Sequence, residues 1–557
     1  MPPCVLRGVD EVRCTPSPTS VWRVAPPPEN RPPSHQATKP AISVYKHQPV
    51  TPNTPLPLSG LPLFLVTIGL SLGTFMQVLD TSIANVSLPA IAGDLAVSQS
   101  QGTWVITSFT VSNAIALPLT GWLSRRFGDV RLFLAATLLF TVTSLLCGLA
   151  TDLPMLVMAR ILQGACAGPM IPLSQSLLLK NFPPEKKGLA LALWSITVVV
   201  APILGPILGG WITDNISWPW IFFINLPVGL VAAFLTWFIL RKRSSTTAIV
   251  PIDIVGLMLL VLGVGALQIL LDQGNELDWF ESNTIISLAV LAMMALSTLV
   301  IWELTDAHPI VDLHFFTERN FLVGTVVLSI GYLVFFGNMV ILPLWLQSNM
   351  GYTATWAGLA AAPIGIVPVF LSALVGKNIH KIDLRLWATF SFSVFAATSF
   401  WSSGFNTDVT FDQIIVPRFL MGFGIATLFV PLTSLTLSGI PPHLLASATG
   451  LTNFSRIVAG SLGTAISITL WERRAAYHHS TLVTNLATLS PSGGSNALAS
   501  LGDEITPTNP ALLDWAVNRQ AVMLATNDML WLSGCLFLLL MLVVWLAKPP
   551  KSGKPHP

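Results

Sequence analysis

Charged side chains are scarce in this sequence. Asp, Glu, Lys and Arg make up 10% of its 557 residues, whereas 52% of the residues are hydrophobic. A soluble protein of this length would carry far more charge. Apolar runs of about 20 residues, each long enough to cross the hydrocarbon core of a bilayer, recur between short polar breaks. The composition therefore predicts an all-α integral membrane protein whose functional site lies between its helices.

The sequence also lacks the usual signs of a metal, disulfide or nucleotide site. Its five cysteines show no CxxC spacing, and the adjacent His478 and His479 have no Cys or acidic neighbour at ligand spacing. No GxxxxGK[ST] loop is present, so any energy for transport is expected from an ion gradient instead of ATP. We expect no cofactor, no metal and no enzymatic activity. Nucleic-acid binding is not expected, because the basic residues form no stripe with interleaved aromatics.

The apolar runs divide the chain into segments. Residues 1–57 are rich in proline and lack apolar periodicity, which predicts a disordered extension, and they contain no apolar core of a signal peptide. The rest predicts fourteen helices, at residues 61–87, 103–123, 131–150, 154–179, 188–212, 220–240, 251–271, 283–303, 321–343, 355–376, 386–403, 413–438, 447–470 and 526–547.

Lysine and arginine fix the expected orientation. If the N-terminus is cytoplasmic, most of the basic loop residues lie on the cytoplasmic side. The outer loops then hold only Arg473, Arg474 and Arg519. Basic loops face the cytoplasm. An even number of helices then places both termini on the cytoplasmic side.

An internal repeat predicts two halves. MARILQG, IPL and FPP in the first half correspond to VPRFLMG, VPL and IPP in the second, and the interval from Arg160 to Pro183 equals that from Arg418 to Pro441. Repeats in the same orientation are typical of two-halved transporters. We expect a six-helix bundle at 58–243, two extra helices at 244–312, and a second six-helix bundle at 313–547. A long outer loop at 472–525 and a cytoplasmic tail at 548–557 complete the prediction.

Asp80 and Arg160 are the first candidate site residues. A carboxylate within an apolar helix is costly and usually faces a cavity or a partner. With a rise of about 1.5 Å per residue, both residues lie about 10 Å below the outer surface, and they could pair there. A carboxylate that alternates between a paired and an unpaired state could carry a proton. Two simpler interpretations stay open, with Asp80 marking a wetted helix end and Arg160 clamping backbone carbonyls.

Further candidates surround this pair. Polar residues within helices could line a substrate cavity or could simply bond to neighbouring helices; these are Asn113, Gln163, Ser174, Gln175 and Arg456. A second set could serve gating or only helix packing and orientation, through close glycine contacts, a proline bend and a basic loop. This set comprises Gly121, Arg125, Arg126, Gly128, Arg131, Gly205, Pro206, Gly209, Gly210 and Arg418.

Five ordered motifs carry a resemblance to a known family. They are LDTSIANVSLP, GWLSRRFGDVRLF, RILQGACAGPMIPLSQSLLL, APILGPILGGWI and WPWIFFINLPVG. With them the chain resembles the major facilitator superfamily, specifically its fourteen-helix drug:proton antiporters of the EmrB/QacA type. Arg125 stands where the wider family often has Asp, but the EmrB branch carries a basic residue there.

This resemblance implies a function. It implies the major facilitator fold and proton-driven export of hydrophobic or amphipathic compounds across a bacterial inner membrane, with proton coupling at Asp80 and Arg160. The GPxxGG pattern from Gly205 to Gly210 is associated in the family with exporters. A periplasmic adaptor and an outer-membrane channel are the implied partners. Alternatives are an exporter of one metabolite, siderophore or fatty acid, and a membrane sensor without transport.

Overall fold

All regular secondary structure in the described part of the chain is helical. The structure is a computed structural model that describes residues 57–243, 247, 251, 253–306, 309–379, 381–488 and 510–548. The predicted disordered extension and the predicted tail lie outside these ranges except for Pro57 and Lys548. Within them we find no strand, in agreement with the predicted all-α fold class.

Within its described residues, the first half of the chain forms nine α-helices before the extra pair. They are α1 (Gly60–Asp94), α2 (Gln99–Gly102), α3 (Trp104–Phe127), α4 (Asp129–Gly148), α5 (Leu153–Ala167), α6 (Met170–Asn181), α7 (Lys187–Asn215), α8 (Trp220–Phe223) and α9 (Asn225–Leu240). The extra pair consists of α10 (Ile254–Gln273) and α11 (Asn283–Thr305).

The second half follows a similar course. Its helices are α12 (Arg319–Asn349), α13 (Ala354–Ala361), α14 (Ile366–Asn378), α15 (Leu384–Ser402), α16 (Phe411–Thr436), α17 (Leu445–Thr488) and α19 (Pro510–Val543). Each of the fourteen predicted ranges lies on one of these helices or on a broken pair of them. Broken pairs occur at Pro169 between α5 and α6, at Ile224 between α8 and α9, and around Pro363 between α13 and α14. At Pro169 and Pro363 the proline cannot donate the helical hydrogen bond.

Local signals explain several helix starts. The Asp152 carboxylate accepts a hydrogen bond from the Met155 amide at 2.8 Å at the start of α5. Thr410 and Gln413 form a reciprocal capping box at the start of α16. Such side chains satisfy amides that have no partner within the helix.

Eleven helices of the described ranges are long and apolar enough to cross a membrane, and up to 12 if a bent pair within α7 counts as one span. The bent pair turns by 43° between Pro202 and Ile207. Helices α3 and α15 are long enough but carry many polar residues. The structure therefore supports a polytopic membrane protein, and the count of fourteen spans stays a prediction.

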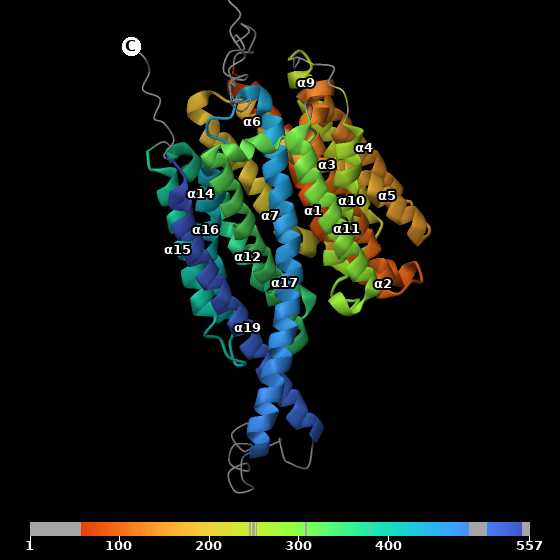
Figure 1. Ribbon diagram of the computed structural model, residues 1–557, viewed down its shortest axis with the longest axis vertical. Coiled ribbons are helices and arrows are strands. Elements are labelled where there is room, and N and C mark those ends of the chain that lie inside the picture. The colour runs from red at the N-terminus through yellow and green to blue at the C-terminus, as the bar shows by residue number, and fades with distance from the viewer. Residues whose placement is uncertain are drawn as a thin grey trace, which may run out of the picture. The chain divides into compact units, whose positions relative to one another are not determined.

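The predicted outer loop at 472–525 differs from the structure. Helix α17 continues to Thr488 and α19 already begins at Pro510, so only residues 489–509 lie outside the described helices. Figure 1 shows the two extensions side by side, beyond the ends of the other helices. Asp528, just beyond the extension of α19, accepts hydrogen bonds from Arg474 and His478 of the α17 extension, at 2.7 and 2.8 Å. Gly, Ser and Asn in the centre of the segment 472–525 suggest a loop, although the two ends of the segment are helical.

Packing brings the functional helices together. Helix α1 packs against α7 and α9, α3 packs against α5, and α12 packs against α17 and α19. Contacts between the predicted halves run along α7 and α14 and along α3 and α17, and α10 packs on both α3 and α17. The residues from Pro55 onward form one compact unit. The division into two six-helix bundles stays a prediction from the repeat.

Candidate functional site

Asp80 lies inside the protein, in the middle of a helix. Helix α1 continues past the predicted end near Ser87 to Asp94, and the side chain of Asp80 is 0% exposed. The interpretation of Asp80 as a wetted helix end is therefore wrong. A carboxylate at this depth needs partners that replace its hydration.

Arg160 supplies the opposite charge. Its Nη1 lies 2.5 Å from Oδ2 of Asp80, and only 1% of the arginine side chain is exposed. The guanidinium also donates to the Val105 carbonyl at 3.0 Å and lies over the ring of Phe109, 4.2 Å from its centroid. Arg160 therefore binds both the carboxylate and a backbone carbonyl, so it holds α3 and α5 against α1.

Neutral donors complete the environment of the carboxylate. Gln163 donates to Oδ1 of Asp80 at 3.1 Å and accepts from Arg160 at 2.8 Å. Asn225 donates to the same Oδ1 at 2.9 Å and to Ser144 at 3.0 Å. Side chains of α1, α4, α5 and α9 thus form one buried network around Asp80.

Two members of this network were missed by the sequence analysis. Asn225 stands in the quoted motif WPWIFFINLPVG, where an asparagine among apolar residues was an available signal. Ser144 had no comparable signal, because serines are common in membrane helices. Gln163, predicted to line a cavity, belongs instead to the Asp80 network.

The other predicted cavity residues do not form one group. Asn113 accepts a hydrogen bond from Gln77 at 3.4 Å, beside the first network. Ser174 accepts from the indole of Trp194 at 3.1 Å. It lies near the contact between the two halves, where Arg456 has its guanidinium 5.9 Å from the Trp194 ring centroid.

Arg456 and Gln175 meet at Asn453 across the two halves. Asn453 donates to Gln175 of α6 at 3.2 Å, and Arg456 donates to Asn453 at 2.6 Å. The guanidinium of Arg456 lies 4.5 Å from the ring centroid of Tyr332, and the buried Nε of Arg456 has no hydrogen-bond partner in the described ranges. This part of the interface therefore offers a cation framed by aromatic rings.

Close glycine contacts occur where they were predicted on α7. A Cβ at Gly205 would overlap the side chain of Ser82, and one at Gly209 would lie 2.7 Å from Cγ1 of Ile83. Gly210 has ordinary space, since its nearest neighbour is Val86 at 3.9 Å. Pro206 lies within α7, and the structure does not describe its side chain. Small residues thus allow α7 to approach α1 beside Asp80.

The predicted basic loop consists in the structure of the last turn of α3, Gly128 and the first turn of α4, and it contains a buried acid, Asp129, that sequence analysis overlooked. Asp129 forms an ion pair with Lys180 and accepts a hydrogen bond from Ser124. Gly128, at φ 84°, starts α4 in a conformation that favours glycine.

The predicted basic residues of this loop take other positions. The exposed Arg126 lies 5.9 Å from the ring centroid of Trp122, the buried Nε of Arg125 has no partner within the described ranges, and Arg131 is exposed. Lys180 of α6 is the partner of Asp129 here.

The corresponding loop of the second half has its own ion pair. Arg385 donates to Asp383 at 2.8 Å. These hydrogen bonds hold the pKa of the Asp383 carboxyl below its usual value. Each half thus has an acid neutralised by a nearby base at the predicted cytoplasmic surface.

Glycines also bring the two halves together near this surface. A Cβ at Gly376 would overlap the Gly188 carbonyl oxygen, and a Cβ at Gly188 would overlap the Gly376 carbonyl oxygen. A Cβ at Gly121 would overlap Ser447 of α17. The ends of α7 and α14, and of α3 and α17, are therefore in backbone contact in this conformation.

The described ranges contain no group of three or more His, Cys, Asp or Glu side chains that could hold a metal ion. The buried network pairs one carboxylate with one guanidinium and supplies further hydrogen bonds to the carboxylate from Gln163 and Asn225. Arg418, the repeat counterpart of Arg160, lies apart from both sites on α16.

Comparisons with known proteins match this architecture. Residues 70–464 match the family model described as Major Facilitator Superfamily. The multidrug export protein EmrB of Haemophilus influenzae is 52% identical over 497 residues, covering 89% of this chain and 97% of the relative. The fatty acid resistance protein FarB of Neisseria gonorrhoeae is 49% identical over 498 residues, covering 89% and 98%. Among solved structures, the proton:xylose symporter XylE matches with a TM-score of 0.55 at 15% identity, covering 87% and 95%, which concerns the fold alone.

Proposed function

Because the chain belongs to the Major Facilitator Superfamily, we propose that it is a proton-driven exporter of hydrophobic or amphipathic toxic compounds. The observation that carries the proposal is the fully buried pair of Asp80 and Arg160. A carboxylate that can exchange an arginine partner for a proton is what coupling requires. The likeness to EmrB supports export as the direction of transport.

The proposed cycle uses alternating access between two conformations. Substrate binds between the halves near Arg456, Trp194 and Tyr332 while Asp80 is deprotonated and paired with Arg160. Protonation from the outer side breaks this pair, which favours release of the substrate outward. A proton that moves inward gains about 2.3 kcal/mol per 100 mV of membrane potential, so one or two protons can drive a substantial gradient. Loss of the proton to the cytoplasm restores the pair.

The glycine contacts support a gate at the cytoplasmic ends. With the orientation predicted from Lys and Arg, the backbone contacts at Gly188 and Gly376 close the cytoplasmic side. These helix ends would have to separate before a substrate could enter from the cytoplasm or inner leaflet. The ion pair of Asp129 and Lys180 joins the start of α4 to the end of α6 within the first half, so it fixes that half beside the gate and does not cross it.

Everted membrane vesicles test this function directly. Adding a transported compound to vesicles that hold a proton gradient should release lumenal protons, because substrate and proton exchange across the membrane. The measurement is the recovery of a pH-sensitive dye on addition of each compound in a panel of amphipathic cations, acids and neutral molecules. A membrane sensor without transport would give no proton release with any compound, which would contradict the proposal.

The same panel distinguishes a second candidate function. Export of one class of amphipathic acid, such as fatty acids, is favoured by the likeness to FarB. It is also favoured by the buried Arg456, whose Nε lacks a partner within the described ranges. Proton release with acids alone would favour this narrow function, whereas release with several charge types would favour a multidrug exporter.

We also propose an inner-membrane location, with cytoplasmic termini, and a periplasmic adaptor that continues to an outer-membrane channel. The extensions of α17 and α19 offer a contact surface for the adaptor, since Tyr477 and Trp515 are 57% and 56% exposed there. Exposed aromatic residues of this kind are common anchors of protein interfaces.

Replacing both Tyr477 and Trp515 with alanine should weaken the contact with the adaptor without affecting transport across the inner membrane. We expect about tenfold weaker adaptor binding and lower resistance in intact cells, with unchanged proton release in everted vesicles. Trp401→Ala, at the exposed outer end of α15, is the matched control and should change neither quantity. Full resistance of cells with the double variant would contradict an adaptor contact at this surface.

A further inference from the structure

The second half contains a buried cation without a protein counterion. The side chain of Arg418 on α16 lies within the protein, with the residue 6% exposed, and donates a hydrogen bond to the Met421 sulfur at 3.9 Å. Among the described residues no carboxylate lies within ion-pair distance of its guanidinium. A buried charge is strongly destabilising unless an opposite charge and hydrogen bonds compensate it. Arg418 therefore differs from Arg160, which has both.

The repeat shows why the carboxylate is missing. Asp80 precedes Arg160 by 80 residues, and the residue at the same interval before Arg418 is Asn338. Ser402 precedes Arg418 by the same interval as Ser144 precedes Arg160, and Met421 replaces Gln163 three residues after the arginine. The second half thus keeps the framework of the Asp80 network on α12, α15, α16 and α19 but has an amide in place of the acid.

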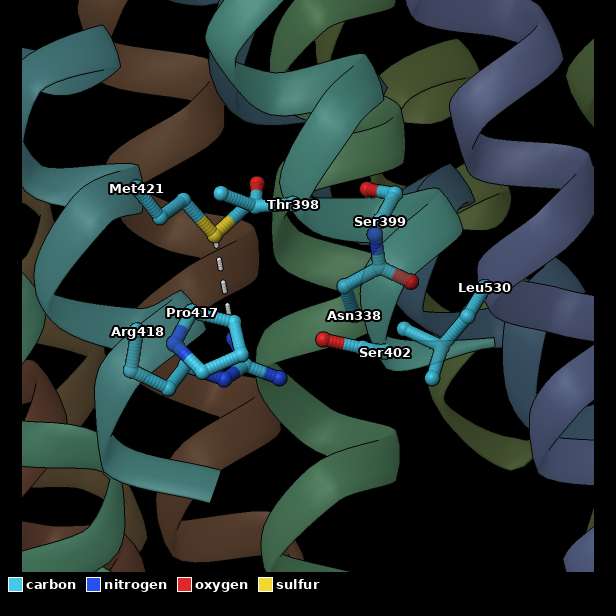
Figure 2. Close-up of a pocket in the computed structure, with 8 residues that line it drawn as sticks. All are labelled: Asn338, Thr398, Ser399, Ser402, Pro417, Arg418, Met421 and Leu530. Atoms are coloured by element: carbon cyan, nitrogen blue, oxygen red, sulfur yellow. Dashed lines mark hydrogen bonds between the residues drawn. The ribbon is translucent and has the colours of Figure 1, made fainter. Parts of the chain in front are cut away.

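A small cavity lies at this position. Figure 2 shows Arg418 extending from α16 toward Ser402, with Asn338 and Ser399 beyond it. The cavity has about 10 Å³ of space for a water-sized sphere and is also lined by Thr398, Pro417, Met421 and Leu530. This space suits one monoatomic ion or one water molecule.

The polar groups of the cavity are mainly hydrogen-bond donors. Oδ1 of Asn338 already accepts from Ser533 at 3.0 Å, and the buried Nδ2 of Asn338 has no partner among the described residues. The guanidinium, this amide nitrogen and the hydroxyl of Ser402 can all donate to one acceptor. A cation would be repelled by Arg418, and a neutral water molecule would leave the charge uncompensated.

We propose that this cavity binds a small monovalent inorganic anion of halide size, which serves as the counterion of Arg418. The anion takes the place that the Asp80 carboxylate occupies beside Arg160. Its function is to stabilise the packing of α16 against α12 and α15. The site is too small for the carboxylate end of an amphipathic substrate, so it is distinct from the interface near Arg456.

Thermal unfolding of the purified full-length protein in detergent tests the proposal. The midpoint Tm is compared in chloride, bromide and gluconate at equal ionic strength. We expect chloride and bromide to raise the Tm of the wild-type protein by a few degrees, because ligands that bind the folded state stabilise it. In Asn338→Asp, a protein carboxylate replaces the anion, so the Tm in gluconate should rise and the effect of halide should disappear.

Asn349→Asp is the matched control, since it adds the same charge on the same helix at a site away from Arg418. It should keep the full effect of halide. Crystals grown in bromide provide a second measurement that does not depend on a variant, with an anomalous peak expected between Arg418 and Asn338. No halide effect on the wild-type Tm, an equal effect in Asn338→Asp, or a water molecule in place of bromide would each overturn the proposal.

Discussion

Asp80→Asn is expected to reduce pH-driven efflux to the background level of vesicles without the protein. The amide cannot lose and regain a proton, so substrate movement is no longer linked to proton movement. The substitution would also leave the Arg160 guanidinium without its counterion, and loss of one partner of a buried ion pair costs about 3–5 kcal/mol. Efflux and substrate-evoked proton release are measured in everted vesicles, and Tm is measured in detergent.

Stability and coupling can be separated by two further variants. Asp80→Glu keeps a titratable carboxylate and should retain part of the proton release. Asp94→Asn makes the same substitution in the same helix, where, within the described residues, the carboxylate accepts a hydrogen bond from the Trp218 indole at 2.7 Å, and it should keep both activities. Substrate binding by Asp80→Asn should persist, because Asp80 lies apart from the interface at Arg456. Unchanged pH-driven efflux in Asp80→Asn would contradict the coupling role.

The pairing of Asp80 with Arg160 is predicted by matching the depths of the two residues, and the structure contains the pair although α1 ends at Asp94 and not near Ser87. Helix length and the rise per residue place two residues at one level in the membrane. They say nothing of the rotation of each helix, which decides which polar residues face the carboxylate. For this reason the sequence predicts a cavity position for Gln163 and does not identify Asn225 and Ser144 as partners of Asp80. The 80-residue interval from Asp80 to Arg160, counted back from Arg418, identifies Asn338 as the counterpart of Asp80.

Other differences come from contacts between distant segments. The sequence predicts a gating role for Arg125, Arg126 and Arg131 after α3. The structure shows an ion pair there between Asp129 and Lys180 of α6. No local pattern relates these two residues. Likewise, the extensions of α17 and α19 contact each other, as in the hydrogen bond between His479 and Asp514 at 3.2 Å, so each helix alone gives a weak signal.

A valine at Gly376 is expected to open the cytoplasmic ends and to stop transport. Its Cβ would overlap the carbonyl oxygen of Gly188 and lie 2.7 Å from Cβ of Ala192. Because backbone atoms cannot move aside as side chains do, the closed arrangement should lose about 1–3 kcal/mol. That corresponds to a shift of about 5- to 150-fold between the two conformations. An exporter that cannot close its cytoplasmic side fails to complete its cycle, so efflux should fall with it.

Spin labels at the exposed Lys186 and Lys377 report this opening, since Lys186 directly precedes α7 and Lys377 lies on α14 next to Gly376. The distance between the labels should lengthen in Gly376→Val, while the Tm stays near that of the labelled parent because the open conformation remains folded. Gly358→Val is the matched control, because a Cβ there has no atom within 4 Å. It should leave both the label distance and efflux unchanged. If Gly376→Val keeps the parent distance and full efflux, then the glycine contact does not form part of the gate, and closure must depend on the contact of α3 with α17 instead.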